Sequence, residues 1–320
     1  MENSEISALL TSVNTYEEFE QLRLNQTDFT AAAREIMQRH HLPDQPLTLF
    51  ADGCNLVYAL GDERVIKIFL PCHQDQFRGD LLVMQHLRDK LSVKTPNIEF
   101  SGELCGWPYI VMTQLPGTLL EGLWESLSQN NKIVLIRELG SLIKEVHALD
   151  TQGLEAIDCN WPKFIQRQIQ GCFAQHQANE LPTTLINEIP DYLQSVELPT
   201  YSKPVLLTGE YTPMNFLVNQ VDGIWHITGL IDFGDAMLGL PQYDLLGPGA
   251  FLIQGNKELL KEFLLAYGYT ENSFTEKFSQ QMTALMLLHQ HSHLPRQIRI
   301  NNWQQQVSSM KDLQELVWGL

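Results

Sequence analysis

Basic residues are scarce in this chain. It has 21 lysines and arginines against 38 aspartates and glutamates, which gives a formal net charge of −17. A field of this sign repels phosphate groups, so it argues against a nucleic-acid or anionic-membrane partner and favours a cationic one. Because surface acidity also serves solubility, the charge alone does not decide between a cationic partner and a merely soluble surface.

Cysteines and long apolar runs are also few. The five cysteines are an odd number and include no C-x-x-C pair, which argues against a disulfide framework or a zinc ribbon. This usage favours a reducing, cytoplasmic location. No run approaches the roughly 18 apolar residues that span a bilayer, and the opening segment 1–14 is acidic. We therefore expect neither an export signal nor a transmembrane helix.

Two common phosphate-handling patterns are missing as well. The chain contains no G-x-x-x-x-G-K-[ST] sequence, which removes the most frequent ATP-binding loop architecture. It also has no H-R-D-type loop and no A-P-E-like segment, so a protein kinase is a less suitable interpretation.

The pattern along the chain predicts two lobes and a helical extension. The 320 residues suffice for two lobes, and 44% of them are hydrophobic, as in globular proteins. We expect helices in an N-terminal extension at 1–45, a β-rich lobe at 46–115 with one helix near 77–91, and a mainly helical lobe at 116–320. The expected strands are 47–51, 56–60, 65–69, 98–101, 109–113, 205–207, 216–218 and 225–233.

The second lobe contains the stretch with the clearest chemical character. Glu210, the amide Asn215 and a second carboxylate, Asp232, lie on predicted tight turns between short apolar strands. This set suits phosphoryl transfer, because one carboxylate can accept a hydroxyl proton while amide and carboxylate oxygens hold Mg²⁺ against nucleotide phosphates. The same residues also fit two ordinary turns, in which Asp, Asn and Gly serve the backbone.

These segments resemble the catalytic core of the aminoglycoside phosphotransferase and choline kinase-like family. That family has the pattern H-G-D-x-x-x-x-N followed by I-D-[FW]-x-[DE], and 231–245 is most similar to its hygromycin-B kinase branch. Residues 65–69 resemble the strand of the nucleotide lysine, and 106–112 resemble the strand that leads to the hinge. The resemblance covers about 47–300. It implies an α+β, two-lobed protein-kinase-like fold with a small β-rich N-lobe and a larger, mainly helical C-lobe.

The resemblance also implies roles for residues of the N-lobe, which would bind the nucleotide. Lys67 would contact the α- and β-phosphates, Ile66 would form one wall of the adenine pocket, and Met112 and Gln114 would lie at the hinge. The family pairs this lysine with a glutamate, whereas this chain has Asp80 at the aligned position. Because aspartate is one methylene shorter, the helix must approach by about 1.5 Å to keep the pair.

The C-lobe would carry the catalytic loop and the substrate site. Asn215 and Asp232 match the family's metal ligands, and Asp244 is expected to brace the loop by hydrogen bonds. The loop departs from the pattern twice, with Thr208 in place of histidine and Glu210 in place of the catalytic aspartate. The longer Glu210 side chain can still accept a proton or orient the hydroxyl, but a displacement of about 1 Å at a catalytic group can reduce the rate roughly a hundredfold. Slow or absent turnover is therefore the alternative to full activity.

The expected activity follows from these roles. With ATP and Mg²⁺, the protein would phosphorylate a hydroxyl of a small molecule. GTP is the alternative phosphoryl donor. An aminoglycoside suits the acidic chain, although the same fold also serves choline, homoserine and other acceptors. The alternative from another class is a kinase-like protein, impaired in catalysis, that binds a nucleotide or another ligand. The sequence does not predict the oligomeric state.

Overall fold

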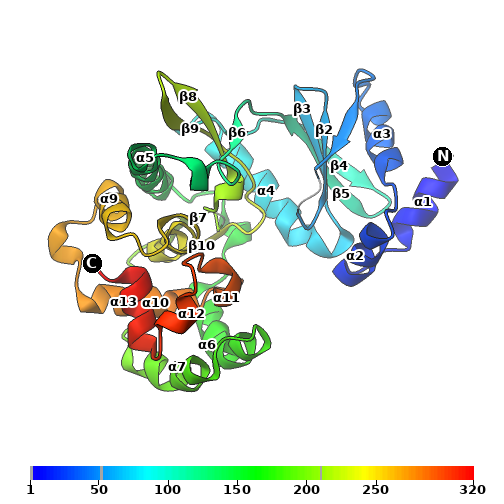
Figure 1. Ribbon diagram of the computed structural model, residues 1–320. Coiled ribbons are helices and arrows are strands. Elements are labelled where there is room, and N and C mark those ends of the chain that lie inside the picture. The colour runs from blue at the N-terminus through cyan, green and yellow to red at the C-terminus, as the bar shows by residue number, and fades with distance from the viewer. Residues whose placement is uncertain (1–2, 51–52, 210) are drawn as a thin grey trace. The chain divides into compact units, whose positions relative to one another are not determined.

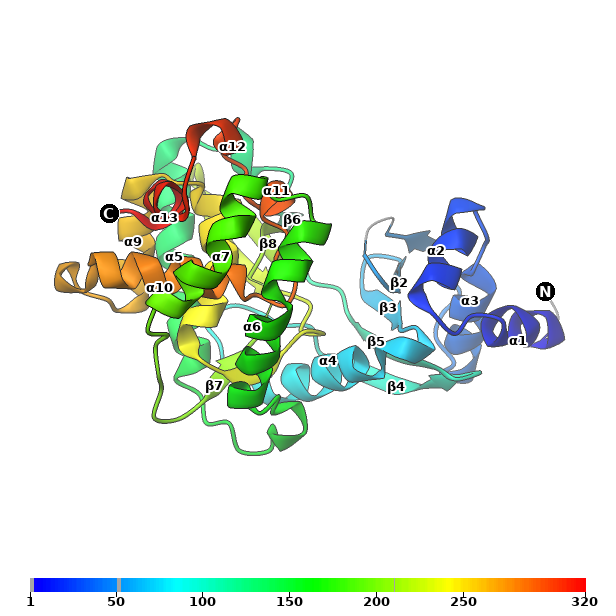
Figure 2. The same ribbon diagram turned by 90° about the horizontal axis from the view of Figure 1, so that it is seen from below.

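The computed structural model describes residues 3–50, 53–209 and 211–320, without the side chains of residues 3–5 (Figures 1 and 2). The chain forms two compact units. The β unit comprises Met1–Lys90, Lys94–Pro116 and Asp232–Asp235, and the helical unit comprises Leu91–Val93, Gly117–Ile231 and Ala236–Leu320. The short segment Asp232–Asp235 therefore clusters with the β unit, although the chain on both sides of it belongs to the helical unit.

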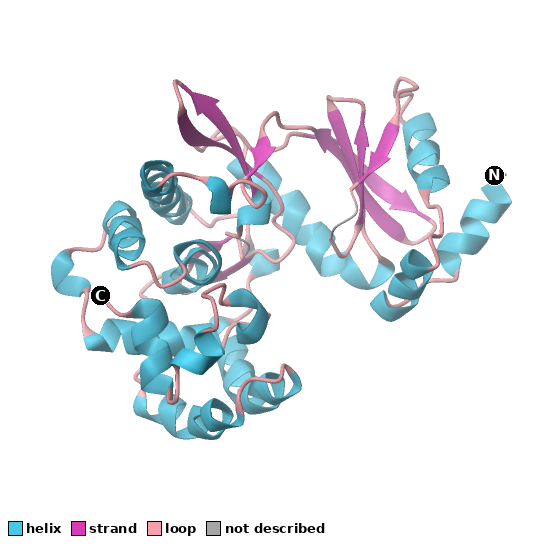
Figure 3. Ribbon diagram, viewed as in Figure 1, coloured by secondary structure: helices cyan, strands magenta, loops and turns pink. Residues whose placement is uncertain are grey.

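The β unit is built on a five-stranded antiparallel sheet with the order β1-β2-β3-β5-β4. Its strands match the predicted ones closely, and β2 matches residue for residue. Figure 3 shows the strands of the protein in magenta. The elements of the unit are α1 (Asn3–Thr11), α2 (Tyr16–Leu24), α3 (Thr30–Arg39), β1 (Leu47–Leu49), β2 (Leu56–Leu60), β3 (Arg64–Ile68), η1 (Pro71–His73), α4 (Gln74–Leu87), β4 (Ile98–Leu104) and β5 (Trp107–Thr113).

The helices α1 to α3 share one hydrophobic core with this sheet. Leu10, Phe19 and Ile36 from the helices lie in the same buried cluster as Tyr58 and Trp107 from the strands. The Trp107 Nε1–H also donates a hydrogen bond to the Leu10 carbonyl at 2.9 Å. Since this burial removes a large apolar area from water, the N-terminal helices contribute to the stability of the β unit itself.

Truncation of Phe19 tests this contribution. Its ring is fully buried and lies 5.7 Å from the Phe29 ring and 6.2 Å from the Trp107 ring, measured between centroids. We expect Phe19→Ala to lower the free energy of unfolding by roughly 3–5 kcal/mol, because it removes a buried ring and leaves a cavity. Leu24→Ala on the same helix is the control, since Leu24 is 73% exposed. Equal, small losses in the two variants, measured by denaturant unfolding, would show that these helices do not support the core.

The helical unit is organised around a long amphipathic helix, α5, and a small sheet with the order β6-β8-β9. Ser128 caps α5 by accepting a hydrogen bond from the Asn131 N–H. The helices and strands of the helical unit are β6 (Thr118–Leu119), η2 (Trp124–Ser126), α5 (Gln129–His147), η3 (Glu155–Ile157), α6 (Trp161–Ala178), α7 (Thr183–Ser195), β7 (Val205–Leu207), η4 (Pro213–Asn215), β8 (Phe216–Val221), β9 (Ile224–Leu230), β10 (Met237–Gly239), η5 (Pro241–Leu245), α8 (Leu246–Pro248), η6 (Gly249–Ile253), α9 (Lys257–Tyr267), η7 (Glu271–Ser273), α10 (Glu276–Leu287), α11 (Leu294–Gln297), α12 (Trp303–Gln306) and α13 (Met310–Trp318).

The two units together confirm the predicted α+β class, with a β-rich part and a larger, mainly helical part. Within the described part of the chain, no helix combines the length and the apolar character that a membrane crossing requires.

Candidate functional site

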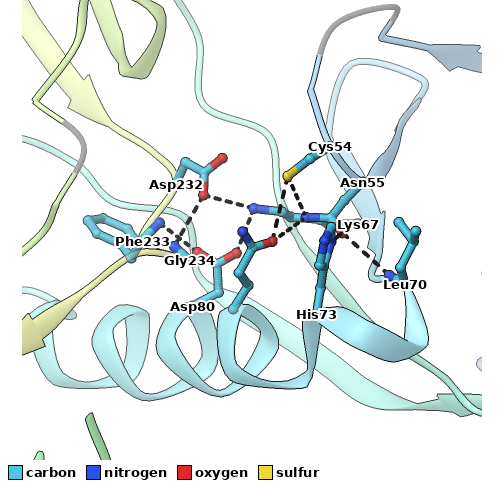
Figure 4. Close-up of polar contacts among 10 residues, drawn as sticks. Cys54, Asn55, Lys67, Leu70, His73, Asp80, Asp232, Phe233 and Gly234 are labelled. Carbon is cyan, nitrogen blue, oxygen red and sulfur yellow. Dashed lines mark hydrogen bonds and ion pairs between the residues drawn. The ribbon is translucent and has the colours of Figure 1, made fainter. Parts of the chain in front are cut away.

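A buried lysine lies between two carboxylates in the β unit. The Lys67 ammonium donates to Asp80 Oδ2 at 2.6 Å and to Asp232 Oδ1 at 2.9 Å (Figure 4). The Lys67 side chain is 7% exposed and that of Asp80 2%, whereas 40% of the Asp232 side chain is exposed. The structure thus brings together three of the residues that the sequence singled out, from β3, α4 and the turn after β9.

Both carboxylates of this cluster have a local structural reason for their positions. Asp80 is part of the buried face of α4, and its Oδ1 accepts a hydrogen bond from the Phe233 N–H at 2.7 Å. Asp232 has a φ of +64°, a left-handed conformation that aspartate tolerates better than most residues. Its Oδ1 also accepts from the Gly234 N–H at 3.3 Å, which closes a tight local turn. The turn therefore presents the carboxylate of Asp232 to Lys67.

The electrostatics of the cluster favour a charged lysine. Burial alone would lower the pKa of Lys67, but Asp232 and Asp80 outweigh it and raise that pKa above its ordinary value. Burial is also the largest influence on Asp80 and raises the pKa of its carboxyl group, while the Lys67 ammonium opposes the rise. The cluster consequently keeps the Lys67 side chain as a buried ammonium ion.

The apolar surface beside Lys67 differs from the predicted one. Ile66 is fully buried in the core that includes α1 to α3, and neighbouring residues of a strand point to opposite faces. Ile66 therefore lies on the face of the sheet opposite Lys67, and the predicted wall of the adenine pocket would have to come from a different residue on the face of Lys67. Val65 shares the face of Lys67, and its register partners are Ala59 on β2 and Met112 on β5. Val65 and Met112 are only half-buried, so they offer an apolar surface next to the ammonium group.

Gln114 follows the end of β5, at the predicted hinge. Its backbone N–H donates to the Glu63 carbonyl at 2.7 Å and so extends the pairing of the sheet. The side chain is half-buried. A ligand contact by Gln114 would therefore use its carbonyl or its side chain, since the N–H is already committed.

A second cluster braces the loop that was predicted to be catalytic. Glu210 itself lies outside the described residues. Just before it, the Thr208 and Gly209 N–H groups donate to Asp244 Oδ2 and Oδ1, each at 3.1 Å, which confirms the predicted brace. His147 at the end of α5 adds a contact of 3.1 Å between its Nε2 and Asp244 Oδ2. Sequence reasoning missed His147, because only its place at the end of an amphipathic helix distinguishes it.

Replacing Asp244 tests whether this brace matters. Asparagine keeps one oxygen and gains an NH₂ group, so one of the two backbone N–H donors would face another donor. We expect Asp244→Asn to lower the free energy of unfolding by about 2 kcal/mol and also to lower turnover. The control is Asp150→Asn, since the Asp150 side chain is 69% exposed. Unchanged thermal unfolding and unchanged turnover in Asp244→Asn would contradict the bracing role.

Asn215 lies immediately before the β8–β9 hairpin. It closes η4, is 7% exposed, and its carbonyl accepts from the Ile231 N–H at 3.0 Å. This bond continues the β8–β9 register, in which Phe216 pairs with Leu230. Among the side chains that the structure describes, no group of three or more His, Cys, Asp or Glu could hold a metal.

The known proteins to which this chain is similar are phosphotransferases. The profile of the phosphotransferase enzyme family matches residues 47–276. The GDP complex of wild-type aminoglycoside 2'-phosphotransferase-IIIa is similar in structure, with a TM-score of 0.67 and 19% identity over 81% of this chain and 89% of that chain. The streptomycin-ATP ternary complex of APH(2")-IIa has a TM-score of 0.57 and 15% identity over 79% of this chain and 88% of that one.

Macrolide 2'-phosphotransferase MphH from Brachybacterium faecium is also similar, with a TM-score of 0.56 and 21% identity over 80% of this chain and 90% of that one. At sequence identities this low, the similarity to these structures shows a shared fold. It confirms the predicted kinase-like fold class.

Proposed function

Because the chain belongs to the phosphotransferase enzyme family, we propose that it transfers the γ-phosphoryl group of ATP to a hydroxyl group of a small molecule. The observation that carries this proposal is the buried Lys67 ammonium, charged between Asp80 and Asp232. A fixed ammonium is the kind of group that binds nucleotide phosphates. The half-buried Val65 and Met112 on the same face of the sheet offer an apolar surface suited to a nucleobase.

The residues of the chain also suit Mg²⁺. Asn215 and Asp232 would hold the ion through hard oxygen donors, the type that Mg²⁺ prefers. Asp232 Oδ2 takes part in neither the Lys67 nor the Gly234 contact, and the side chain is 40% exposed. When bound, Mg²⁺ neutralises charge on the phosphates. Glu210 would accept the proton of the attacking hydroxyl or orient that hydroxyl.

The acceptor that we propose is an aminoglycoside or a similar cationic sugar. The formal net charge of −17 favours encounter with a polycation. Similar solved structures are named as complexes with kanamycin and streptomycin, and another as a macrolide phosphotransferase. GTP is the alternative donor, since the same group of structures includes GDP complexes.

A second function is favoured by the two departures in the loop. Thr208 and Glu210 replace residues of the family pattern, so the protein would bind nucleotide without turning it over. Against this alternative, the backbone of Thr208 is held by Asp244 even without the histidine.

Mass spectrometry of reaction mixtures tests the proposal. The full chain is incubated with Mg²⁺, ATP or GTP, and a panel of aminoglycosides, macrolides and small amino alcohols. A mass gain of one phosphate on a panel member supports phosphotransfer and identifies the acceptor class. Tight, Mg²⁺-dependent nucleotide binding without any phosphorylated product would support the binding protein instead.

A further inference from the structure

One face of α4 lies against the turn that carries Asp232. Gln76, Gly79 and Asp80 share this face, because residues three and four apart are neighbours on a helix. Asp80 connects the two sides directly, since one oxygen takes the Lys67 ammonium at 2.6 Å and the other takes the Phe233 N–H at 2.7 Å (Figure 4). The carboxylate thus links β3, α4 and the turn.

Gly79 allows this contact to be close. A Cβ added at Gly79 would lie 3.0 Å from the carbonyl oxygens of both Phe233 and Gly234, which is tighter than most real Cβ contacts. Both neighbours are backbone atoms, so neither can rotate away as a side chain would. On the other side of the contact, a Cβ at Gly234 would meet the Cβ of Gln76 at 3.3 Å. Helix and turn therefore meet with a glycine on each side, although alanine is the better helix former.

Asp80 needs this closeness. Its carboxylate is only one methylene from the backbone of α4, the residue is buried, and the carboxylate makes two short contacts at once. If α4 moved away from the turn, this short side chain would lose the Phe233 N–H, the Lys67 ammonium or both. If the side chain were longer, the buried space would not accommodate it without a shift of the helix.

We propose that Gly79 and Asp80 act together as a spacer that sets the distance between α4 and the turn, and thereby positions Asp232 for Mg²⁺ and nucleotide. They are positioning residues. The link to Mg²⁺ rests on the proposed function, whereas the spacer itself is a property of the protein without ligand. The proposal predicts that a change at one of the two residues alters the effect of a change at the other.

Three variants test the spacer: Gly79→Ala, Asp80→Glu and the double variant. The readout is the Mg²⁺ concentration that gives half-maximal binding of a non-hydrolysable ATP analogue, measured by calorimetry. We expect each single change to raise this concentration roughly tenfold, because misplacement of a ligating group is costly. In the double variant, the longer glutamate side chain partly spans the wider gap that the alanine opens between α4 and the turn. The rise in the required Mg²⁺ concentration should therefore be at least about threefold smaller than the product of the two single-variant rises.

Two matched controls separate the spacer from general effects. Gly171→Ala changes a helical glycine of α6 whose added Cβ would meet nothing within 4 Å. Asp75→Glu lengthens an aspartate of α4 whose side chain is 97% exposed. Both should leave the Mg²⁺ requirement unchanged.

Single defects that simply multiply in the double variant would overturn the spacer, as would an unchanged Mg²⁺ requirement in Gly79→Ala. If the double variant does not fold, the Mg²⁺ requirement of Gly79→Ala is compared with that of Gly171→Ala, and an equal requirement in the two overturns the spacer. If the unaltered protein binds no Mg²⁺-nucleotide, the proposed function fails and the spacer is judged by thermal unfolding without ligand. There, a double variant less destabilised than the sum of the single variants supports the spacer, and additive losses overturn it.

Discussion

Replacing Asp232 with asparagine should lower the phosphotransfer rate at least roughly a thousandfold, because the carboxylate that would hold Mg²⁺ becomes a neutral amide. The fold should survive, since asparagine readily adopts the left-handed conformation found here at φ +64°. The variant should also need far more Mg²⁺ to bind nucleotide. Initial rates at several Mg²⁺ concentrations, with the acceptor identified by mass spectrometry, give both quantities.

Asp222→Asn is the matched control for this variant. Asp222 also has a left-handed backbone, with a φ of +50°, and lies exposed in the turn between β8 and β9. Its replacement should leave turnover unchanged. A full rate in Asp232→Asn would remove Asp232 from the catalytic machinery.

Replacing Lys67 with methionine should lower kcat/KM for the nucleotide at least about a hundredfold, because the phosphates lose their fixed positive charge. The change also leaves Asp80 buried without its cation, which is costly in a protein interior. We therefore expect a lower Tm as well. Nucleotide binding by calorimetry at a temperature well below that Tm separates the lost phosphate contact from the lost stability.

Lys203→Met controls for the removal of a lysine that pairs with an aspartate. Lys203 contacts Asp150 at 3.1 Å with both side chains mostly exposed, so its loss should change neither binding nor Tm measurably. Nucleotide affinity that is equal in Lys67→Met and in the unaltered protein would contradict the role of Lys67.

Local pattern predicted the strands well and long-range packing poorly. Residues 56–60 and 205–207 form strands with the predicted bounds, because short apolar runs between turns define them. In contrast, α1 to α3 share a core with the sheet because their apolar faces pack against it. Periodicity identifies an apolar helix face but does not specify the surface against which that face packs. The clustering of Asp232–Asp235 with the β unit is likewise a long-range effect.

The candidate site was predicted mainly through the family pattern. The profile match confirms that family, and the structure contains the expected contact between Lys67 and Asp80. Ile66 shows where this approach failed, since resemblance identified the strand but not which of its faces each residue occupies. The alternation of side chains along a strand already places Ile66 and Lys67 on opposite faces, and Val65 on the same face as Lys67. The position of His147 at the end of an amphipathic helix did not reveal its role, because that role depends on the distant Asp244.

The most direct test of the account is a crystal structure of the full chain with Mg²⁺ and a non-hydrolysable ATP analogue. We expect the Lys67 ammonium to contact the α- and β-phosphates, and oxygens of Asn215 and Asp232 to coordinate the same Mg²⁺ ion. A nucleotide bound elsewhere, with Lys67 still held only by Asp80 and Asp232, would contradict the account.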